Sequence, residues 1–95
     1  MTSNRWSTAG TVLSGANSGT IPIRESVKEV RVSVRPGTSA TVHSTNVPVA
    51  SIAAGSWEEW GRGVITADAS DVVFGATALK ITATSGDCNY NLTGF

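Results

Sequence analysis

The sequence predicts an all-β protein, a small antiparallel β-sandwich or barrel of about seven short strands with an extended N-terminal arm. In several segments every second residue is apolar, which is the pattern of a half-buried strand. Clusters of turn-forming residues separate these segments at a spacing of roughly 8–12 residues. No window shows the periodicity of a helix, and 95 residues suffice for one compact domain.

The clearest predicted strand is 27–35, VKEVRVSVR, in which alternate valines face one side. A Pro-Gly pair then ends it with turn chemistry. The next segment, 38–45, alternates in the same way and is expected to be its hairpin partner. The residues of this pair expected to face the core are Val30, Val32, Val34, Ala40 and Val42.

The remaining predicted strands are shorter or less regular, and successive hairpins are expected to make the sheets antiparallel. Pro22 confines the segment 20–25 to a sheet edge or a strand start. The segment 47–55 fits either a strand or an irregular crossing. Further strands are expected at 63–67, 71–75, 77–85 and 88–95, with Leu79, Ile81, Ala83, Cys88, Tyr90 and Leu92 on their apolar side.

Residues 1–19 are expected to form an arm outside the single sandwich domain, which spans 20–95. This stretch is rich in Ser, Thr, Gly and Asn, with isolated apolar residues at Trp6, Val12 and Leu13. It fits either a frayed terminus or an extended arm that lies along a neighbouring subunit. Only the second gives Trp6 a role, so these three residues are candidate interface contacts.

Charged residues make up 15 % of the chain, and seven basic residues balance seven acidic ones. Copies of a chain without net charge repel one another little, which favours packing against itself or a larger assembly. The same balance argues against nucleic acid as a partner, because that binding depends on Lys and Arg neutralising phosphates. Glutamates 25 and 29 interrupt the local basic cluster, which consists of Arg24, Lys28, Arg31 and Arg35.

The N-terminus lacks the charged region and continuous apolar stretch of a signal peptide, and no run has the length of a transmembrane helix. The protein is therefore expected to be made in a cytosol and not to bind a membrane. Its one cysteine, Cys88, rules out an internal disulfide and fits assembly in a reducing compartment. The position of Cys88 on the apolar side of its strand favours a buried packing role over a reactive thiol.

The sequence offers no arrangement of catalytic or metal-binding residues. Glu58 and Glu59 are adjacent, so on an extended strand they point to opposite faces and cannot act as a carboxylate pair. His43 is the only histidine, and with Cys88 alone it does not make a zinc site. The expectation is a protein that is not an enzyme and that carries no cofactor or metal.

Two of the three tryptophans lie in the segment SWEEWGRG, 56–63. On a strand, Trp57 and Trp60 face opposite ways unless a bulge brings them to one side. One interpretation is that one ring closes the open end of the sandwich and the other makes a subunit contact. The alternative is a sugar-stacking platform, for which Glu58 and Arg62 supply polar neighbours.

The runs 27–45 and 56–86 resemble small virion proteins of tailed bacteriophages. In that family a hairpin precedes a Trp-containing segment, a glycine, a "D-V-x-x-G" turn and a "T-A-L-K-I-T-A" strand. The resemblance leaves out the N-terminal arm. It implies a non-enzymatic structural role, as a capsid decoration (cement) protein or as a fibre or tail accessory module. The matching residues are Trp57, Trp60, Gly63, Asp71, Gly75 and 77–83.

The functional prediction is a virion structural protein, most specifically a decoration protein that binds and stabilises the major capsid shell. Its expected partners are the major capsid protein or other virion proteins and copies of itself, as a homo-trimer, in a virion assembled in the host cytoplasm. A tail or fibre accessory module, and a carbohydrate-binding module that uses the Trp pair, are the alternatives. The candidate interface residues are Trp6, Val12, Leu13, Trp57, Trp60, Arg62 and Phe95.

Overall fold

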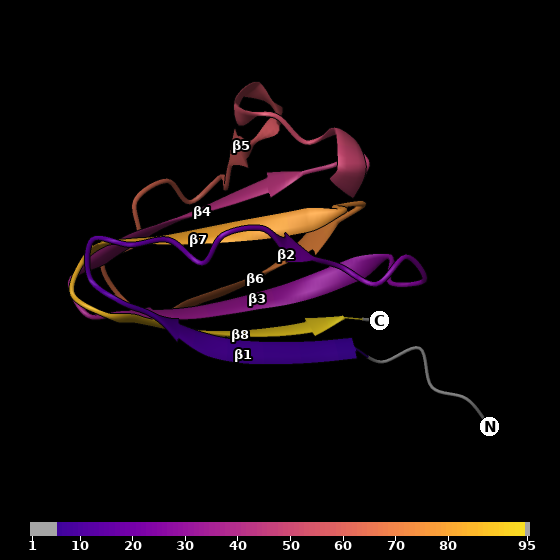
Figure 1. The fold of residues 1–95 in the computed structure, drawn as a ribbon. Coiled ribbons are helices and arrows are strands. Elements are labelled where there is room, and N and C mark those ends of the chain that lie inside the picture. The colour runs from indigo at the N-terminus through magenta and orange to yellow at the C-terminus, as the bar shows by residue number, and fades with distance from the viewer. Residues whose placement is uncertain (1–5, 95) are drawn as a thin grey trace.

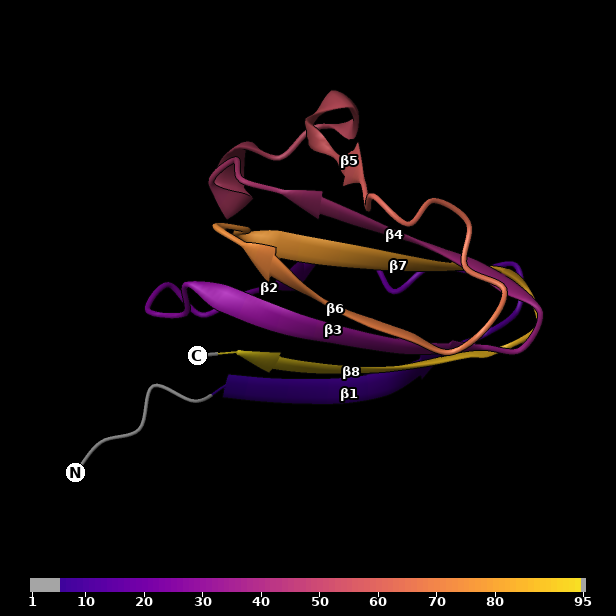
Figure 2. The same cartoon turned by 180° about the vertical axis from the view of Figure 1, so that it is seen from behind.

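The computed structural model describes residues 6–94, which fold into a two-layer β-sandwich. Two four-stranded sheets, antiparallel throughout, face each other (Figure 1, and from behind Figure 2), which confirms the predicted fold class. The elements are β1 (Trp6–Val12), β2 (Ile21–Pro22), β3 (Glu29–Pro36), β4 (Ser39–Thr45), the short 3-10 turns η1 (Val49–Ser51) and η2 (Ala54–Ser56), β5 (Glu58–Glu59), β6 (Ala69–Phe74), β7 (Ala78–Ser85) and β8 (Cys88–Gly94).

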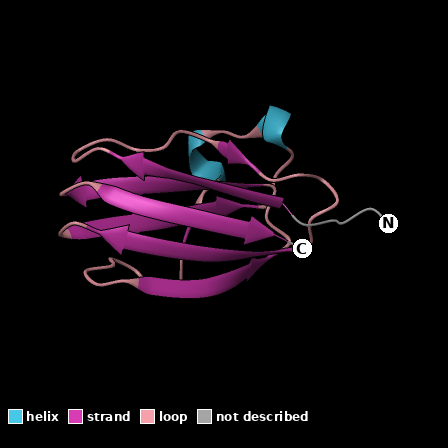
Figure 3. Cartoon of the chain, turned by 90° about the horizontal axis from the view of Figure 1, so that it is seen from below, coloured by secondary structure: helices cyan, strands magenta, loops and turns pink. Residues whose placement is uncertain are grey.

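The chain changes sheet at nearly every connection. Sheet A holds β1, β8, β3 and β6 in that spatial order, and sheet B holds β2, β7, β4 and β5. The strands run lengthwise between two ends of the molecule (Figure 3). We call one of them the terminal end, because β1 begins and β8 ends there; it also holds the β2–β3 and β6–β7 connections (Figure 1). At the far end lie the β1–β2, β3–β4 and β7–β8 connections.

The hairpin predicted between 27–35 and 38–45 is wrong, although both segments contain strands. β3 has β8 on one side and β6 on the other, so neither of its edges is free for β4. The turn at Pro36 and Gly37 instead carries the chain across to sheet B, where β4 pairs with β7. Alternation shows which face of a strand is buried, but it does not identify the neighbouring strand.

The core lies between the sheets and follows the predicted alternation. The three valines of β3, at positions 30, 32 and 34, are at most 2 % exposed. Tyr90 is only partly buried, although it packs against the core. The other predicted inward residues are all fully buried: Ala40, Val42, Leu79, Ile81, Ala83, Cys88 and Leu92.

The predicted boundary between arm and domain at residue 20 is wrong, because β1 is a strand of the sandwich. It pairs with β8 along its whole length, from Trp6 opposite Gly94 to Val12 opposite Cys88. Trp6 lies over Gly94 and packs against the core, and Val12 is 4 % exposed. Residues 1–5 of the predicted arm lie outside the described residues.

After β1 the chain crosses to sheet B and follows the outer edge of β7. The Gly15 N–H donates to the Ala83 carbonyl at 2.7 Å, and the Ser18 N–H donates to the Ile81 carbonyl at 2.8 Å. β2 continues along the same edge, so Pro22 has the edge position that its missing N–H requires.

The structure also decides the conformation of the predicted segments 63–67 and 47–55. The predicted strand at 63–67 is wrong apart from one bridge between Ile65 and Ala40. The segment 47–55, left open between strand and crossing, is an irregular crossing that contains η1 and part of η2. In the described part of the chain, no helix has the length and apolar character needed to cross a membrane.

Candidate interaction surface

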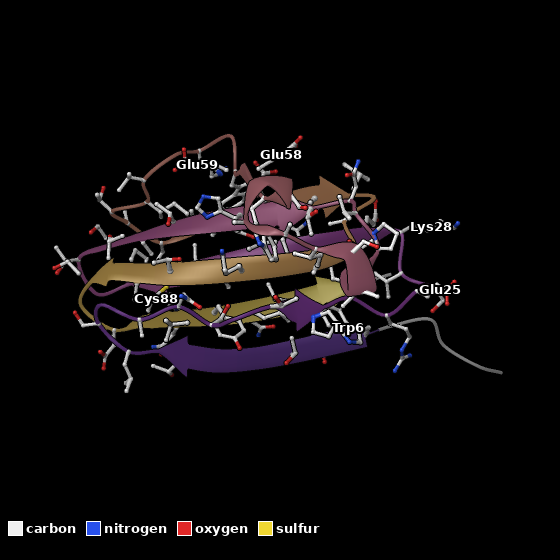
Figure 4. The ribbon with its side chains drawn as sticks, turned by 45° about the horizontal axis from the view of Figure 1, so that its top comes forward. Trp6, Glu25, Lys28, Glu58, Glu59 and Cys88 are labelled. Atoms are coloured by element: carbon white, nitrogen blue, oxygen red, sulfur yellow. The ribbon has the colours of Figure 1, made fainter. Side chains whose placement is uncertain are left out.

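The predicted interface residues do not gather on one surface. Val12 is 4 % exposed in the core of its own sandwich, so it is not an anchor for a neighbouring subunit, whereas Trp6 is partly buried and packs against that core (Figure 4 shows Trp6 beside β1). Leu13 is different, because it follows β1 at the far end and is 65 % exposed. Phe95 lies outside the described residues.

Trp57 and Trp60 lie on opposite sides of β5. Trp57 is beneath the ammonium group of Lys80, whose Nζ is 4.7 Å from the ring centroid, and Lys80 alternates with buried residues of β7. Trp57 therefore lies on the outer face of sheet B. Trp60 is partly buried and packs against the core. The two rings thus do not form a common sugar-stacking platform, and the closing role expected of one of them stays a prediction.

Arg62 connects the β5 side of sheet B with the β6 edge of sheet A. Its guanidinium carbon is 5.6 Å from the Trp60 ring centroid, and its Nε is 3.4 Å from Asp71 Oδ2. Its Nη2 also donates to the Ser70 carbonyl at 3.4 Å. Such half-exposed ion pairs stabilise a fold only slightly. Arg62 therefore has partners within its own chain, and its predicted role at an interface stays a prediction.

The side chains of Glu58, Glu59 and His43 lie on or beside the paired strands β4 and β5. Glu58 and Glu59 are both exposed on the two-residue strand β5 (Figure 4). His43 is opposite Glu59 on one side and opposite Lys80 on the other. Within residues 6–94, no group of three His, Cys, Asp or Glu side chains is placed to hold a metal ion.

Cys88 is fully buried between the sheets, as its apolar position predicted. Burial raises the pKa of its thiol, because an apolar surrounding disfavours the thiolate.

We expect Cys88 to react with a maleimide probe on the order of 100-fold more slowly in the native protein than in denaturant at neutral pH. Both the access of the probe and the thiolate fraction are reduced by burial. Mass spectrometry of timed samples gives the rate. Equal rates in the two conditions would show that the start of β8 is open in the native protein.

A groove of 680 Å³ opens at the terminal end of the sandwich. Three connections that are distant in sequence form its walls: β2–β3, β6–β7 and the start of the β4–β5 crossing. Most of its lining is apolar, and three charged residues contribute to it. The lining residues are Ile23, Arg24, Glu25, Val27, Lys28, Pro48, Val49, Gly75, Ala76 and Thr77.

Backbone hydrogen bonds between its walls fix the shape of this groove. The Gly75 N–H donates to the Lys28 carbonyl at 3.1 Å, and the Ile23 N–H donates to the Thr77 carbonyl at 2.9 Å. The Thr77 N–H in turn donates to the Thr45 carbonyl at 2.7 Å, which ties the β6–β7 turn to the end of β4. A site that is already shaped before binding loses little conformational entropy when a partner arrives.

The groove has both apolar and charged groups available for a partner. Val49 is 47 % exposed at its rim, and Phe74, which precedes the Gly75 wall, is 71 % exposed. Within residues 6–94, neither Arg24 nor Lys28 makes an ion pair. Figure 4 shows Glu25 and Lys28 at this end of the molecule. Exposed apolar surface with a charged rim is typical of a protein-binding site.

Sequence reasoning missed this groove. Its apolar residues Ile23, Val27 and Val49 lie in or beside segments with turn residues, where isolated apolar side chains are the only signal. The crossings between the sheets bring them together, and only the crossing at 47–55 was among the alternatives that the sequence offered.

No protein-family model matches this chain, and no curated protein matches it. A solved structure of Bacillus endospore appendages, which form a family of disulfide-linked pili, has a similar fold. The TM-score is 0.55 at 17 % sequence identity, and the alignment covers 95 % of this chain and 81 % of that chain. At this identity the similarity shows the fold alone.

Proposed function

We propose that this protein is a non-enzymatic structural subunit of a large particle, and more specifically a capsid decoration protein of a tailed bacteriophage virion. The observation that carries the proposal is the groove at the terminal end. Its lining is mostly apolar, it is held open by the fold's own hydrogen bonds, and its rim has cations that form no ion pair with any residue of 6–94. Contacts that exist only in the assembled particle stabilise that particle by mass action.

The composition supports the same proposal. The seven basic and seven acidic residues cancel, so copies crowded on a shell repel one another little. The partners in this proposal are the major capsid protein or other virion proteins and further copies of the chain, with a homo-trimer as the expected unit. A tail or fibre accessory module is the second candidate, and the elongated shape, 40 × 31 × 21 Å with the groove at one end, favours it.

The similarity to a pilus subunit fits a role in an assembly, but not a disulfide-linked one. Cys88 is the single cysteine of this sequence and is fully buried. A disulfide to another copy would require the start of β8 to leave the sheet. We therefore propose non-covalent contacts for this chain.

The test is co-sedimentation of the purified protein with shells that lack it. These shells come from a deletion mutant of the phage that normally encodes the protein. Val49→Asp places a charge at the apolar rim of the groove, and its binding is expected to fall by roughly tenfold or more. Val64→Asp is the matched control, because Val64 is 60 % exposed and does not line the groove. The control and the unchanged protein are expected to pellet with shells.

Two results would contradict the proposal. Unchanged protein that stays in the supernatant would exclude binding to the shell. Equal pelleting of both valine variants would show that binding to the shell does not depend on the groove.

A further inference from the structure

The far end of the molecule presents an exposed leucine. Leu13 is 65 % exposed at the β1–β2 connection, whereas the apolar groove lies at the terminal end (Figure 1). The two features are thus at opposite ends of the strands. An apolar side chain at one end and an apolar groove at the other are suited to join copies in a row.

Leu13 is held rigidly in this exposed position. It begins a turn in which the Ala16 N–H donates to the Leu13 carbonyl at 2.9 Å, and Gly15 has the positive φ of 80° that such a turn requires. The Ser14 N–H donates to Asp87 Oδ1 at 2.9 Å, and the Gly86 N–H donates to the Ser14 hydroxyl at the same distance. A side chain on such a fixed turn can bind with little loss of entropy.

The charges next to the two features are complementary. Asp87 lies beside the Leu13 turn and, within residues 6–94, makes no ion pair. The rim of the groove has Arg24 and Lys28, which are also without an ion pair in that part of the chain. A copy whose Leu13 enters the groove brings its Asp87 toward these cations. Glu25 on the same rim disfavours any orientation that places Asp87 beside it.

We propose that the groove of one copy binds the Leu13 turn of a second copy, head to tail. This inference rests on the proposed function, whose partners include further copies of the chain, and it assigns the groove to one of those copies. The two contact surfaces differ, so the contact is heterologous, and repeated contacts close into a ring or extend into a fibre. The contact covers the exposed side chains of Leu13 and Val49, above a groove floor formed by the already buried Ile23 and Val27, and removes apolar surface from water.

Complementation between two variants tests this geometry. Leu13→Asp removes the inserting side chain and keeps the groove, whereas Val49→Asp damages the groove and keeps the leucine. Sedimentation velocity should show that each variant alone stays monomeric at concentrations where the unchanged protein associates. Their dissociation constants are expected to rise roughly 10- to 100-fold. An equimolar mixture should form a one-to-one dimer that does not grow further.

The controls separate loss of contact from loss of fold. Val64→Asp alters an exposed valine outside the groove and should associate like the unchanged protein. Asp87→Asn and Lys28→Glu test the charge contact. Each substitution, made alone in the otherwise unchanged protein, should weaken association. Circular dichroism should show the same strand content in all of them.

A mixture that remains monomeric would overturn the head-to-tail contact, as would unchanged protein that is monomeric at every concentration. Association of Leu13→Asp equal to that of the unchanged protein would overturn it as well. These results concern association between copies, whereas co-sedimentation measures binding to shells in a separate experiment. Failure of the self-contact and failure of the proposed function are therefore distinguishable.

Discussion

Replacing Leu79 by alanine is expected to lower the free energy of unfolding by about 2–5 kcal/mol. Leu79 is fully buried on β7, between Ile21 of β2 and Ser44 of β4. Its truncation leaves a cavity in the core between the two sheets, and the close-packed neighbouring side chains can move only a little to fill that cavity. Domains are stable by only about 5–15 kcal/mol, so this loss is a large part of the total. Guanidinium unfolding followed by tryptophan fluorescence measures it.

Leu13→Ala is the matched control, because it removes the same atoms from a residue that is 65 % exposed. We expect the free energy of unfolding to change by about 0.5 kcal/mol or less. Similar losses for both substitutions would contradict the assignment of Leu79 to the core.

The second large effect is expected at Gly86, in the β7–β8 turn. Its φ is 74°, and an added Cβ would lie 2.9 Å from the Thr38 nitrogen and 3.0 Å from backbone atoms of Gly37. These backbone atoms belong to the β3–β4 turn, whose Gly37 N–H donates to the Asp87 carbonyl at 2.8 Å. Gly86→Ala therefore adds both backbone strain and a clash between the two turns. We expect a loss of more than about 2 kcal/mol in the free energy of unfolding.

Gly63→Ala separates the two contributions to that loss. Gly63 has a similar φ of 64°, but an added Cβ would have no heavy atom within 4 Å. This variant should show backbone strain alone, about 1–2 kcal/mol. Chemical unfolding of both variants under the same conditions gives the difference. Equal losses would mean that the two turns do not pack against each other as described.

Alternation along the sequence predicted the buried faces of β3, β4, β7 and β8, but it missed β1. The inward side of β1 has Thr8 and Gly10 between its two apolar residues, so the pattern of a strand is interrupted. Glycine is needed at position 10, because a Cβ there would lie 2.8 Å from the Tyr90 hydroxyl. The Tyr90 ring thus takes the space of a side chain on the neighbouring strand. The pairing of a glycine on β1 with a large ring on β8 cannot be recognised from the sequence of either strand alone.

Part of the account of SWEEWGRG also followed from the sequence. The sequence left open whether Trp57 and Trp60 face opposite ways or whether a bulge brings them to one side, and their contacts with Lys80 and with the core put them on opposite sides. The groove was not predictable in the same way. It exists only because the β2–β3, β4–β5 and β6–β7 connections meet at one end of the sandwich. Local patterns describe one strand at a time, whereas a site made of three connections depends on the order of the strands.

Electron cryomicroscopy of virions with and without this chain tests the central proposal most directly. The difference map should contain density the size of one small β-sandwich, repeated at symmetry-related positions on the particle. Restoring the chain to deficient virions should restore that density, and Val49→Asp should not. Identical maps with and without the chain would contradict its role as a structural component of the virion.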